Sequence, residues 1–292
     1  MELIRFSYPE KFRAAVQQSL LKHEAENNLP LGILANVQAG EYSDQPPYLA
    51  ALVESGDVSL AVIRTPPYPA LFSYRKEPLS GEAVELVTGD LYAHFGKELK
   101  GMTASKGLIS DLVDVWCRTA RVSAELTMAM RIYELRWVNP VRGVKGRLRM
   151  AGERDRPLLE AWYAGFRRET MGETSQEVPV ADQIDRYLNA DPDQRGMAFW
   201  ESAGQRVSMA GYSGPTPHGI RIGAVYTPPE LRKRGYASAC VTALSQKLLD
   251  QGYKFCFLFT DLQNPTSNHI YQEIGYRPVT DVDTWHFQGN EE

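Results

Sequence analysis

A chain of 292 residues is longer than most single domains, so its length alone favours two domains. Hydrophobic residues make up 43% and charged residues 23%, which is ordinary for a globular protein. The net charge of -4 disfavours a nucleic-acid partner, and no apolar run approaches the roughly 20 residues of a membrane-spanning helix.

The three cysteines lie far apart and the five histidines are scattered, so neither set has the spacing of metal ligands. An odd number of separated cysteines is typical of small core residues in a reduced compartment. The first residues also lack the charged and then apolar layout of a secretory signal. We therefore expect a cytoplasmic protein that holds no metal ion.

The first half of the chain predicts a mixture of helices and strands. Apolar residues at helical spacing predict helices over residues 8–24, 81–98 and 105–119. Apolar and alternating runs predict strands over residues 48–54, 58–64, 70–74 and 122–132. The turn-rich segment 27–47 predicts a loop with a short helix. This half has no glycine-rich phosphate turn and no catalytic constellation, so we expect a structural or substrate-shaping domain.

A linker is expected where proline, glycine and basic residues follow the long strand of the first half. The segment Asn139–Gly146 has this composition, which is typical of a domain boundary. We therefore predict one domain over residues 1–142 and a second over residues 143–292.

The second half predicts one twisted sheet with helices packed on it. Helices are expected after Asp155, around residues 180–188, over residues 235–250 and after Asn264. Strands are expected over residues 147–151, 197–201, 207–212, 220–227, 255–260, 276–279 and 284–287. This order of elements indicates an α+β or mixed α/β fold.

A basic glycine turn, Arg232–Ala237, joins the strand over residues 220–227 to the helix after it. The first N–H groups of a helix have no intrahelical partner, and the helix dipole adds partial positive charge there. Gly235 lets a ligand approach the backbone closely, and three basic side chains add charge. Such a turn could also be a basic surface turn that begins a helix. Its position between a strand and an amphipathic helix favours a phosphate site.

Two motifs in this half resemble those of the GNAT superfamily of acetyl-CoA-dependent N-acetyltransferases. The first is Arg232-x-x-Gly235-x-Ala237 after a strand, and the second is Asn264-x-x-Ser267-x-x-x-Tyr271-x-x-x-Gly275-Tyr276. The resemblance covers about residues 146–288. The first half looks like a degenerate copy of the same fold. The resemblance thus implies tandem acyl-CoA N-acyltransferase-like domains, each a twisted, mostly antiparallel sheet flanked by helices.

The resemblance also implies acetyl-CoA as co-substrate, with its pyrophosphate on the turn and its pantetheine arm beside the preceding strand. A splay between that strand and the strand over residues 255–260 would make the slot. The cofactor-binding residues implied in this way are Val225, Tyr226, Thr227, Arg232, Lys233, Arg234, Gly235, Tyr236, Ala237, Ser238, Asn264, Ser267 and Asn268.

In the family, a tyrosine at the position of Tyr271 protonates the departing coenzyme A thiolate. A phenol with a pKa of about 10 still holds its proton at neutral pH, so the residue type suits that role. The alternative is a half-buried tyrosine that only packs its ring. Asn264 and Tyr271 are spaced to lie on one helix face.

The acceptor amine must lose a proton, and many family members carry a glutamate for this on the strand matching residues 220–227. That strand has no carboxylate here, and the possible substitutes are Glu201, His218, Tyr226 and Asp261. The missing base leaves a small-molecule amine and a peptide amine open as acceptors. It also leaves open a non-catalytic coenzyme A-binding module or a protein-interaction pair of domains. The oligomeric state stays open as well.

Overall fold

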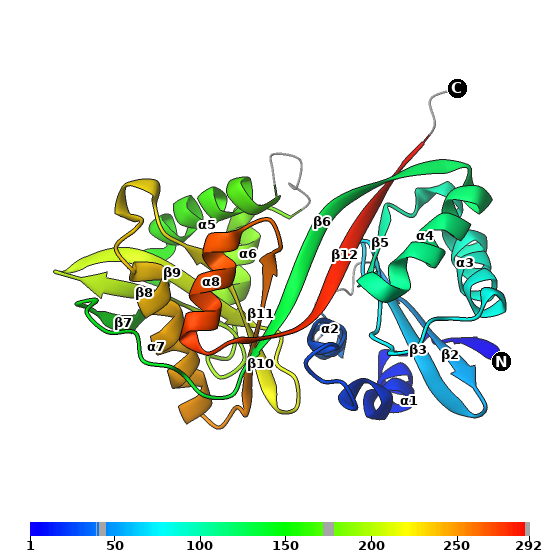
Figure 1. Cartoon of the computed structure of the whole chain (residues 1–292), viewed down its shortest axis with the longest axis horizontal. Helices are drawn as coiled ribbons and strands as arrows, with labels where there is room; N and C mark the ends of the chain where they lie inside the picture. The colour runs from blue at the N-terminus through cyan, green and yellow to red at the C-terminus, as the bar shows by residue number, and fades with distance from the viewer. Residues whose placement is uncertain (39, 41–44, 172–177, 290–292) are drawn as a thin grey trace. The chain divides into compact units, whose positions relative to one another are not determined.

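The computed structural model describes residues 1–38, 40, 45–171 and 178–289. The contacts between residues divide the chain into two compact units, and Figure 1 labels most of their elements. The first unit comprises Met1–Ile132, Thr260–Gln263 and Val279–Glu292, and the second comprises Tyr133–Phe259 and Asn264–Pro278. Among the described residues, no helix is both long and apolar enough to cross a membrane.

The sheet of the first unit has the strand order β1-β2-β3-β4-β5-β12-β6. Helices α1 and α2 pack on one face of β2 and β3, and α3 and α4 pack on the opposite face. The strands are β1 (Glu2–Arg5), β2 (Tyr48–Glu54), β3 (Asp57–Arg64), β4 (Ala70–Phe72), β5 (Gly101–Ser105), β6 (Val122–Leu135) and β12 (Arg277–Gly289). The helices are α1 (Pro9–Leu21), α2 (Asn28–Gln38), α3 (Gly81–Phe95) and α4 (Lys106–Ala120).

The sheet of the second unit runs from the end of β6 through β11, β10, β9 and β8 to β7. Helices α5 and α6 cover one face, and α7 and α8 cover the other. The strands are β7 (Arg147–Met150), β8 (Gly196–Ser202), β9 (Gln205–Ser213), β10 (Gly219–Tyr226) and β11 (Phe255–Asp261). The helices are α5 (Arg156–Met171), α6 (Val180–Leu188), α7 (Tyr236–Asp250) and α8 (Pro265–Ile274).

The two halves of the chain repeat one order of elements. Each begins with a strand and two helices, continues with three antiparallel strands and a helix, and then adds a strand, a helix and a long last strand. Each also contains a parallel pair at the same step, β4 with β5 and β10 with β11. The predicted α+β class, with a mostly antiparallel sheet flanked by helices, is confirmed, and the first half has the layout of the second.

The structure differs from the predicted elements in three places. The short strands β1 and β5 were not predicted, because neither shows an extended alternation of apolar residues. The strands expected over residues 276–279 and 284–287 form one strand, β12, whose polar side chains find partners on neighbouring strands. The segment 27–47 contains α2, a longer helix than expected, and residues 39 and 41–44 lie outside the described part.

The predicted domain limits of 1–142 and 143–292 stay a prediction. The compact units follow a different path, because the chain leaves the first unit at Ile132 and returns to it at Val279. Strand β12 then pairs with β5 in antiparallel register, from Val282 opposite Ser105 to His286 opposite Gly101.

Candidate functional site

Strand β10 carries a bulge near its end, before the chain reaches the basic turn. Its register with β9 jumps from Gly223 opposite Gly211 to Tyr226 opposite Met209, so Ala224 and Val225 together oppose one residue. Ala224 adopts a positive φ of 48°, which is uncommon for a residue with a side chain. The bulge leaves the backbone of both residues outside the regular β9 ladder.

The bulge also exchanges the faces of the strand. Ile222, before the bulge, packs with the helices α7 and α8. Ala224, within the bulge, and Tyr226, after it, pack with α5 and α6, although regular alternation would place both with Ile222. Val225 instead packs toward the side of α7.

Strands β10 and β11 part just before the bulge. Their parallel ladder joins Gly219–Ile222 to Phe255–Leu258, and β10 continues for four residues beyond it. The predicted splay is therefore present. Val225 lies where the strand has left both neighbouring ladders, so its peptide groups are placed to pair with an extended ligand.

Ser208 of β9 fixes the end of the splayed strand. This fully buried residue donates its hydroxyl to the carbonyl of Tyr226 over 3.1 Å. The Thr227 hydroxyl in turn donates to Ser208 Oγ over 2.9 Å. Sequence reasoning missed Ser208, since a single serine in an apolar strand gives no signal of such a role.

The predicted phosphate turn begins α7 with an uncapped end. Lys233 and Gly235 both have positive φ, 61° and 75°, and reverse the chain before the helix. The Ala239 N–H donates to the Gly235 carbonyl over 3.0 Å, and Gly235 provides no side-chain cap. The N–H groups of Tyr236, Ala237 and Ser238 have no intrahelical partner and point toward the turn, which suits an anion.

Packing gives a second reason for glycine at position 235. A Cβ atom there would lie 2.8 Å from Cγ2 of Val144, closer than real contacts allow, in addition to the positive φ. The glycine of the motif is therefore required by the fold itself. Of the basic residues of the turn, Arg234 donates to the Glu230 carbonyl over 3.4 Å, while Arg232 pairs with Glu169 of α5 over 2.6 Å. Lys233 is exposed.

Helix α8 begins with a side-chain cap at Asn264. Its Oδ1 accepts from the Ser267 N–H over 3.0 Å, and Pro265 occupies the first turn. Asn268 donates to the Asn264 carbonyl over 2.8 Å, and its Oδ1 accepts from the Tyr133 hydroxyl over 2.9 Å. The side chains of Asn264 and Asn268 thus both stabilise the start of α8.

Tyr271 lies in the core cluster that also contains Ile222 and Ala239, so the helix α8 brings it to the region of the splay and the turn. It is 9% exposed, and its ring packs edge-on against Tyr276 at 6.0 Å. Burial raises the pKa of Tyr271 to about 12, so the phenol keeps its proton at neutral pH. Among the described residues, its hydroxyl has no hydrogen-bond partner, unlike that of Tyr276, which pairs with Ser245.

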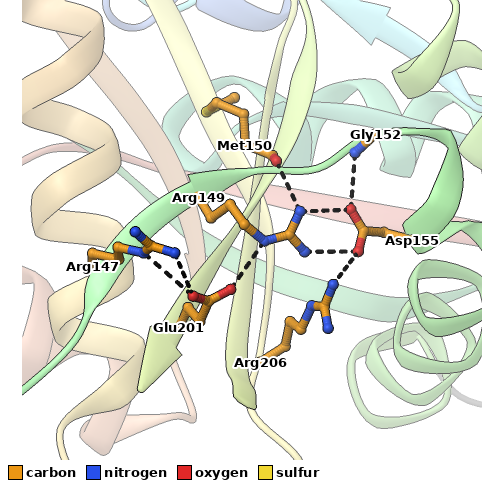
Figure 2. A network of polar contacts seen from close by, with 7 residues as sticks. All are labelled: Arg147, Arg149, Met150, Gly152, Asp155, Glu201 and Arg206. Atoms are coloured by element: carbon orange, nitrogen blue, oxygen red, sulfur yellow. Dashed lines mark hydrogen bonds and ion pairs between the residues drawn. The ribbon is translucent and has the colours of Figure 1, made fainter. Parts of the chain in front are cut away.

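Three of the candidate bases lie in different parts of the fold, Glu201 on β8, His218 just before β10 and Asp261 at the end of β11. Glu201 lies 2.9 Å from Arg147 and 3.3 Å from Arg149, and the hydrogen bond from Arg147 is the main reason that its pKa is lowered (Figure 2). A carboxylate held in this way is a weak base. Asp261 accepts from the Gln263 N–H over 2.8 Å, and the His218 carbonyl accepts from the Lys254 N–H over 2.8 Å.

The same network holds a buried aspartate that the sequence suggested only as a helix cap. Asp155 is 5% exposed and accepts from Arg149 over 2.7 and 2.9 Å (Figure 2). Arg206 and the Gly152 N–H add contacts at 3.1 and 3.0 Å. These groups join β7, β8, β9 and the start of α5, so their role is structural. Within the described residues, no three His, Cys, Asp or Glu side chains are arranged to hold a metal ion.

Comparison with known proteins agrees with this geometry. The model of the acetyltransferase (GNAT) family matches residues 159–276, which include β10, the turn, α7 and Tyr271. A search of curated protein sequences finds no match.

Three solved structures share the fold over nearly the whole chain. A GCN5-related N-acetyltransferase from Sphaerobacter thermophilus has a TM-score of 0.61 and 12% identity, covering 98% of this chain and 95% of its own. A GCN5-related N-acetyltransferase from Kribbella flavida has a TM-score of 0.58 and 14% identity, covering 89% and 96%. A tandem GNAT protein from the clavulanic acid biosynthesis pathway has a TM-score of 0.56 and 10% identity, covering 100% and 99%. Residues 159–276 therefore match the GNAT family of acetyltransferases, and the chain as a whole has a fold like that of these three structures.

Proposed function

We propose that the protein is an acetyl-CoA-dependent N-acetyltransferase that moves the acetyl group directly to a primary amine. The observation that carries the proposal is the bulged, splayed end of β10, which the basic turn connects to the uncapped amino end of α7. One part offers unpaired peptide groups to an extended arm, and the other offers N–H donors to a pyrophosphate. Coenzyme A has both features in this order.

Acetyl-CoA is proposed to lie with its pantetheine arm along Val225–Thr227. The N–H groups of Arg232–Ser238 would hold the pyrophosphate, with basic side chains beside it. We propose that the start of α8 faces the thioester end of the cofactor, with Asn264, Ser267 and Asn268 on the facing side. The cap made by Asn264 supports this, because it fixes the start of α8.

Tyr271 is proposed as the general acid. When the amine attacks the thioester carbon, the C–S bond breaks and the thiolate takes a proton from the phenol. The phenol still holds its proton at neutral pH, because burial raises its pKa, and its hydroxyl has no hydrogen-bond partner among the described residues; both features leave it a proton to give. Burial also raises the pKa of Cys240 and of Cys256 to about 12, so neither offers a thiolate for a covalent intermediate. Direct transfer needs none.

The acceptor is proposed to be a small-molecule or peptide amine. Since the splayed strand has no carboxylate, we propose that the amine loses its proton to a water chain rather than to a side chain of β10. A panel of amines of both classes is therefore the appropriate substrate screen.

Calorimetry with acetyl-CoA and thiol release with the amine panel test the proposal. Wild-type protein should bind acetyl-CoA and release thiol with at least one amine. Tyr271→Phe should keep the binding and lose about 100-fold or more in turnover. Binding without turnover on every amine would indicate a coenzyme A-binding module instead, and a lack of binding would overturn the proposal altogether.

A further inference from the structure

Helix α5 contacts the region of the basic turn at two points on one face. Gly165 and Glu169 are four residues apart, so they lie one helical turn from each other on the same side. The Tyr226 ring lies against Gly165, where a Cβ atom would be 2.6 Å from the tyrosine oxygen. Glu169 holds Arg232, the first residue of the signature. The helix thus contacts both the splayed strand and the turn.

The guanidinium of Arg232 is engaged within the protein. Its Nη2 lies 2.6 and 2.7 Å from the two carboxylate oxygens of Glu169, and its Nε donates to the Thr227 carbonyl over 2.8 Å. Its Cζ stands 5.8 Å from the centre of the Tyr226 ring. These contacts join α5, the end of β10 and the start of the turn through one side chain.

A guanidinium that is already paired with a carboxylate contributes little net positive charge to a pyrophosphate bound nearby. Charge for that group remains available from Lys233 and Arg234 and from the N–H groups of the open helix end. Because its N–H groups bond Glu169 and Thr227, Arg232 stabilises the basic turn rather than offering its charge to a ligand.

We propose that Glu169 is a positioning residue for the cofactor site. It acts through Arg232, which serves as a structural link, or strut, between α5 and the basic turn. The pair holds the turn against α5 so that the N–H groups of α7 are preset for the pyrophosphate. This inference rests on the proposed function, since it concerns how the same site binds coenzyme A.

The two possible roles of Arg232 give opposite results when Glu169 is neutralised. If Arg232 were a phosphate ligand, Glu169 would compete for it, and Glu169→Gln would tighten coenzyme A binding. If Arg232 is a strut, Glu169→Gln loosens the turn and weakens binding. The direction of the change therefore decides between the roles.

Calorimetry with coenzyme A tests this on the full chain. We expect about fivefold weaker binding for Glu169→Gln, the upper range of an exposed ion pair. At saturating acetyl-CoA, kcat should change less than twofold, so the loss appears in KM. The matched control is Glu160→Gln, which removes another carboxylate of α5 paired with Arg156 at 3.8 Å and of similar exposure, 37% against 44%. The control should bind as the wild type does.

A double-mutant comparison completes the test. Arg232→Gln should weaken coenzyme A binding. Adding Glu169→Gln should weaken it no further, because both substitutions remove the same Arg232–Glu169 ion pair. Tighter or unchanged binding by Glu169→Gln, or additive losses, would overturn the inference while the proposed function stands. If the wild type does not bind coenzyme A, the proposed function and this inference both fail.

Discussion

The Tyr133 hydroxyl and the Asn268 side chain form a hydrogen bond of 2.9 Å between the end of β6 and the face of α8. Gln272 donates to the same hydroxyl over 3.2 Å. One fully buried tyrosine therefore anchors two successive turns of the helix that carries Tyr271. The orientation of the proposed acid depends on this anchor.

Tyr133→Phe tests the anchor. The substitution leaves both amide groups without their shared partner, and we expect the free energy of unfolding to fall by about 1 kcal/mol. Turnover should fall several-fold with a smaller change in acetyl-CoA affinity, because the helix of Tyr271 is loosened. Urea unfolding and steady-state kinetics provide the measurements. Tyr253→Phe is the control, since its hydroxyl bonds the Asp193 carbonyl over 2.7 Å outside the site; equal kinetic losses in both variants would contradict the prediction.

Ser208→Ala tests whether the splayed strand end is held from β9. Loss of this buried hydroxyl removes two contacts, to the Tyr226 carbonyl and to Thr227, so coenzyme A should bind several-fold more weakly. Stability should fall by about 1 kcal/mol. Thr88→Val removes a buried hydroxyl of α3 and should leave coenzyme A binding intact. Unchanged affinity in Ser208→Ala would show that the strand holds its shape without the serine.

The chain should bind one coenzyme A rather than two. Helix α3 stands in the first half where α7 stands in the second, but its Ala83 N–H donates to the Ser80 hydroxyl and Glu82 adds a negative charge in its first turn. Both features oppose an anion at that end. The buried Leu112 also occupies in α4 the seventh position, which Tyr271 holds in α8. A calorimetric stoichiometry of two per chain would refute this.

Acid should remove the stability that Asp155 provides. The hydrogen bonds from Arg149 are the main cause that lowers the pKa of this carboxyl in the folded chain. A lowered folded pKa stabilises the protein above the ordinary aspartate pKa of about 4, and the gain is lost as the pH falls through the folded value. Asp155→Asn should cost about 3 kcal/mol at pH 7, since it removes the buried carboxylate that accepts charged hydrogen bonds from Arg149 and Arg206.

Urea unfolding of wild type and Asp155→Asn between pH 7 and pH 3 measures that difference. The difference in free energy of unfolding between the two proteins should be constant near neutral pH and should become smaller below about pH 4. Comparing the two cancels the other carboxylates with lowered pKa, such as Glu201 and Asp281, which both proteins keep. A difference that stays constant down to pH 3 would rule out this assignment.

The sequence predicts the turn and α8 well because their signals are local. The spacing of Gly235, Ala237 and Tyr271 depends on helix starts and helix faces, which short stretches determine. The bulge of β10 is different, since it depends on Ser208 of another strand and on a positive φ at Ala224 that the residue type does not indicate. The sequence therefore indicates that β10 and β11 part, but it does not indicate the bulge at which β10 leaves its ladder with β9.

The amide side chains of Asn264 and Asn268 show a further limit of what the sequence predicts. The spacing of Asn264 and Asn268 correctly indicates one helix face, but spacing does not say what lies opposite. Tyr133, more than a hundred residues earlier in the chain, takes up the amide oxygen of Asn268. In the same way, Glu169 gave no signal as the partner of Arg232, whereas Gly165 within a helix was a visible mark of close packing.

The return of β12 to the first unit bears on how the protein is made. Strand β5 pairs with β12 over five residue pairs, Gly101–Ser105 with Val282–His286. During synthesis from the amino end, this edge of β5 stays open until Val282–His286 have left the ribosome. An open strand edge invites pairing with other chains. The sheet of the first unit is therefore completed only after the strands of the second unit have been made, and until then the edge of β5 is a point at which newly made chains can associate.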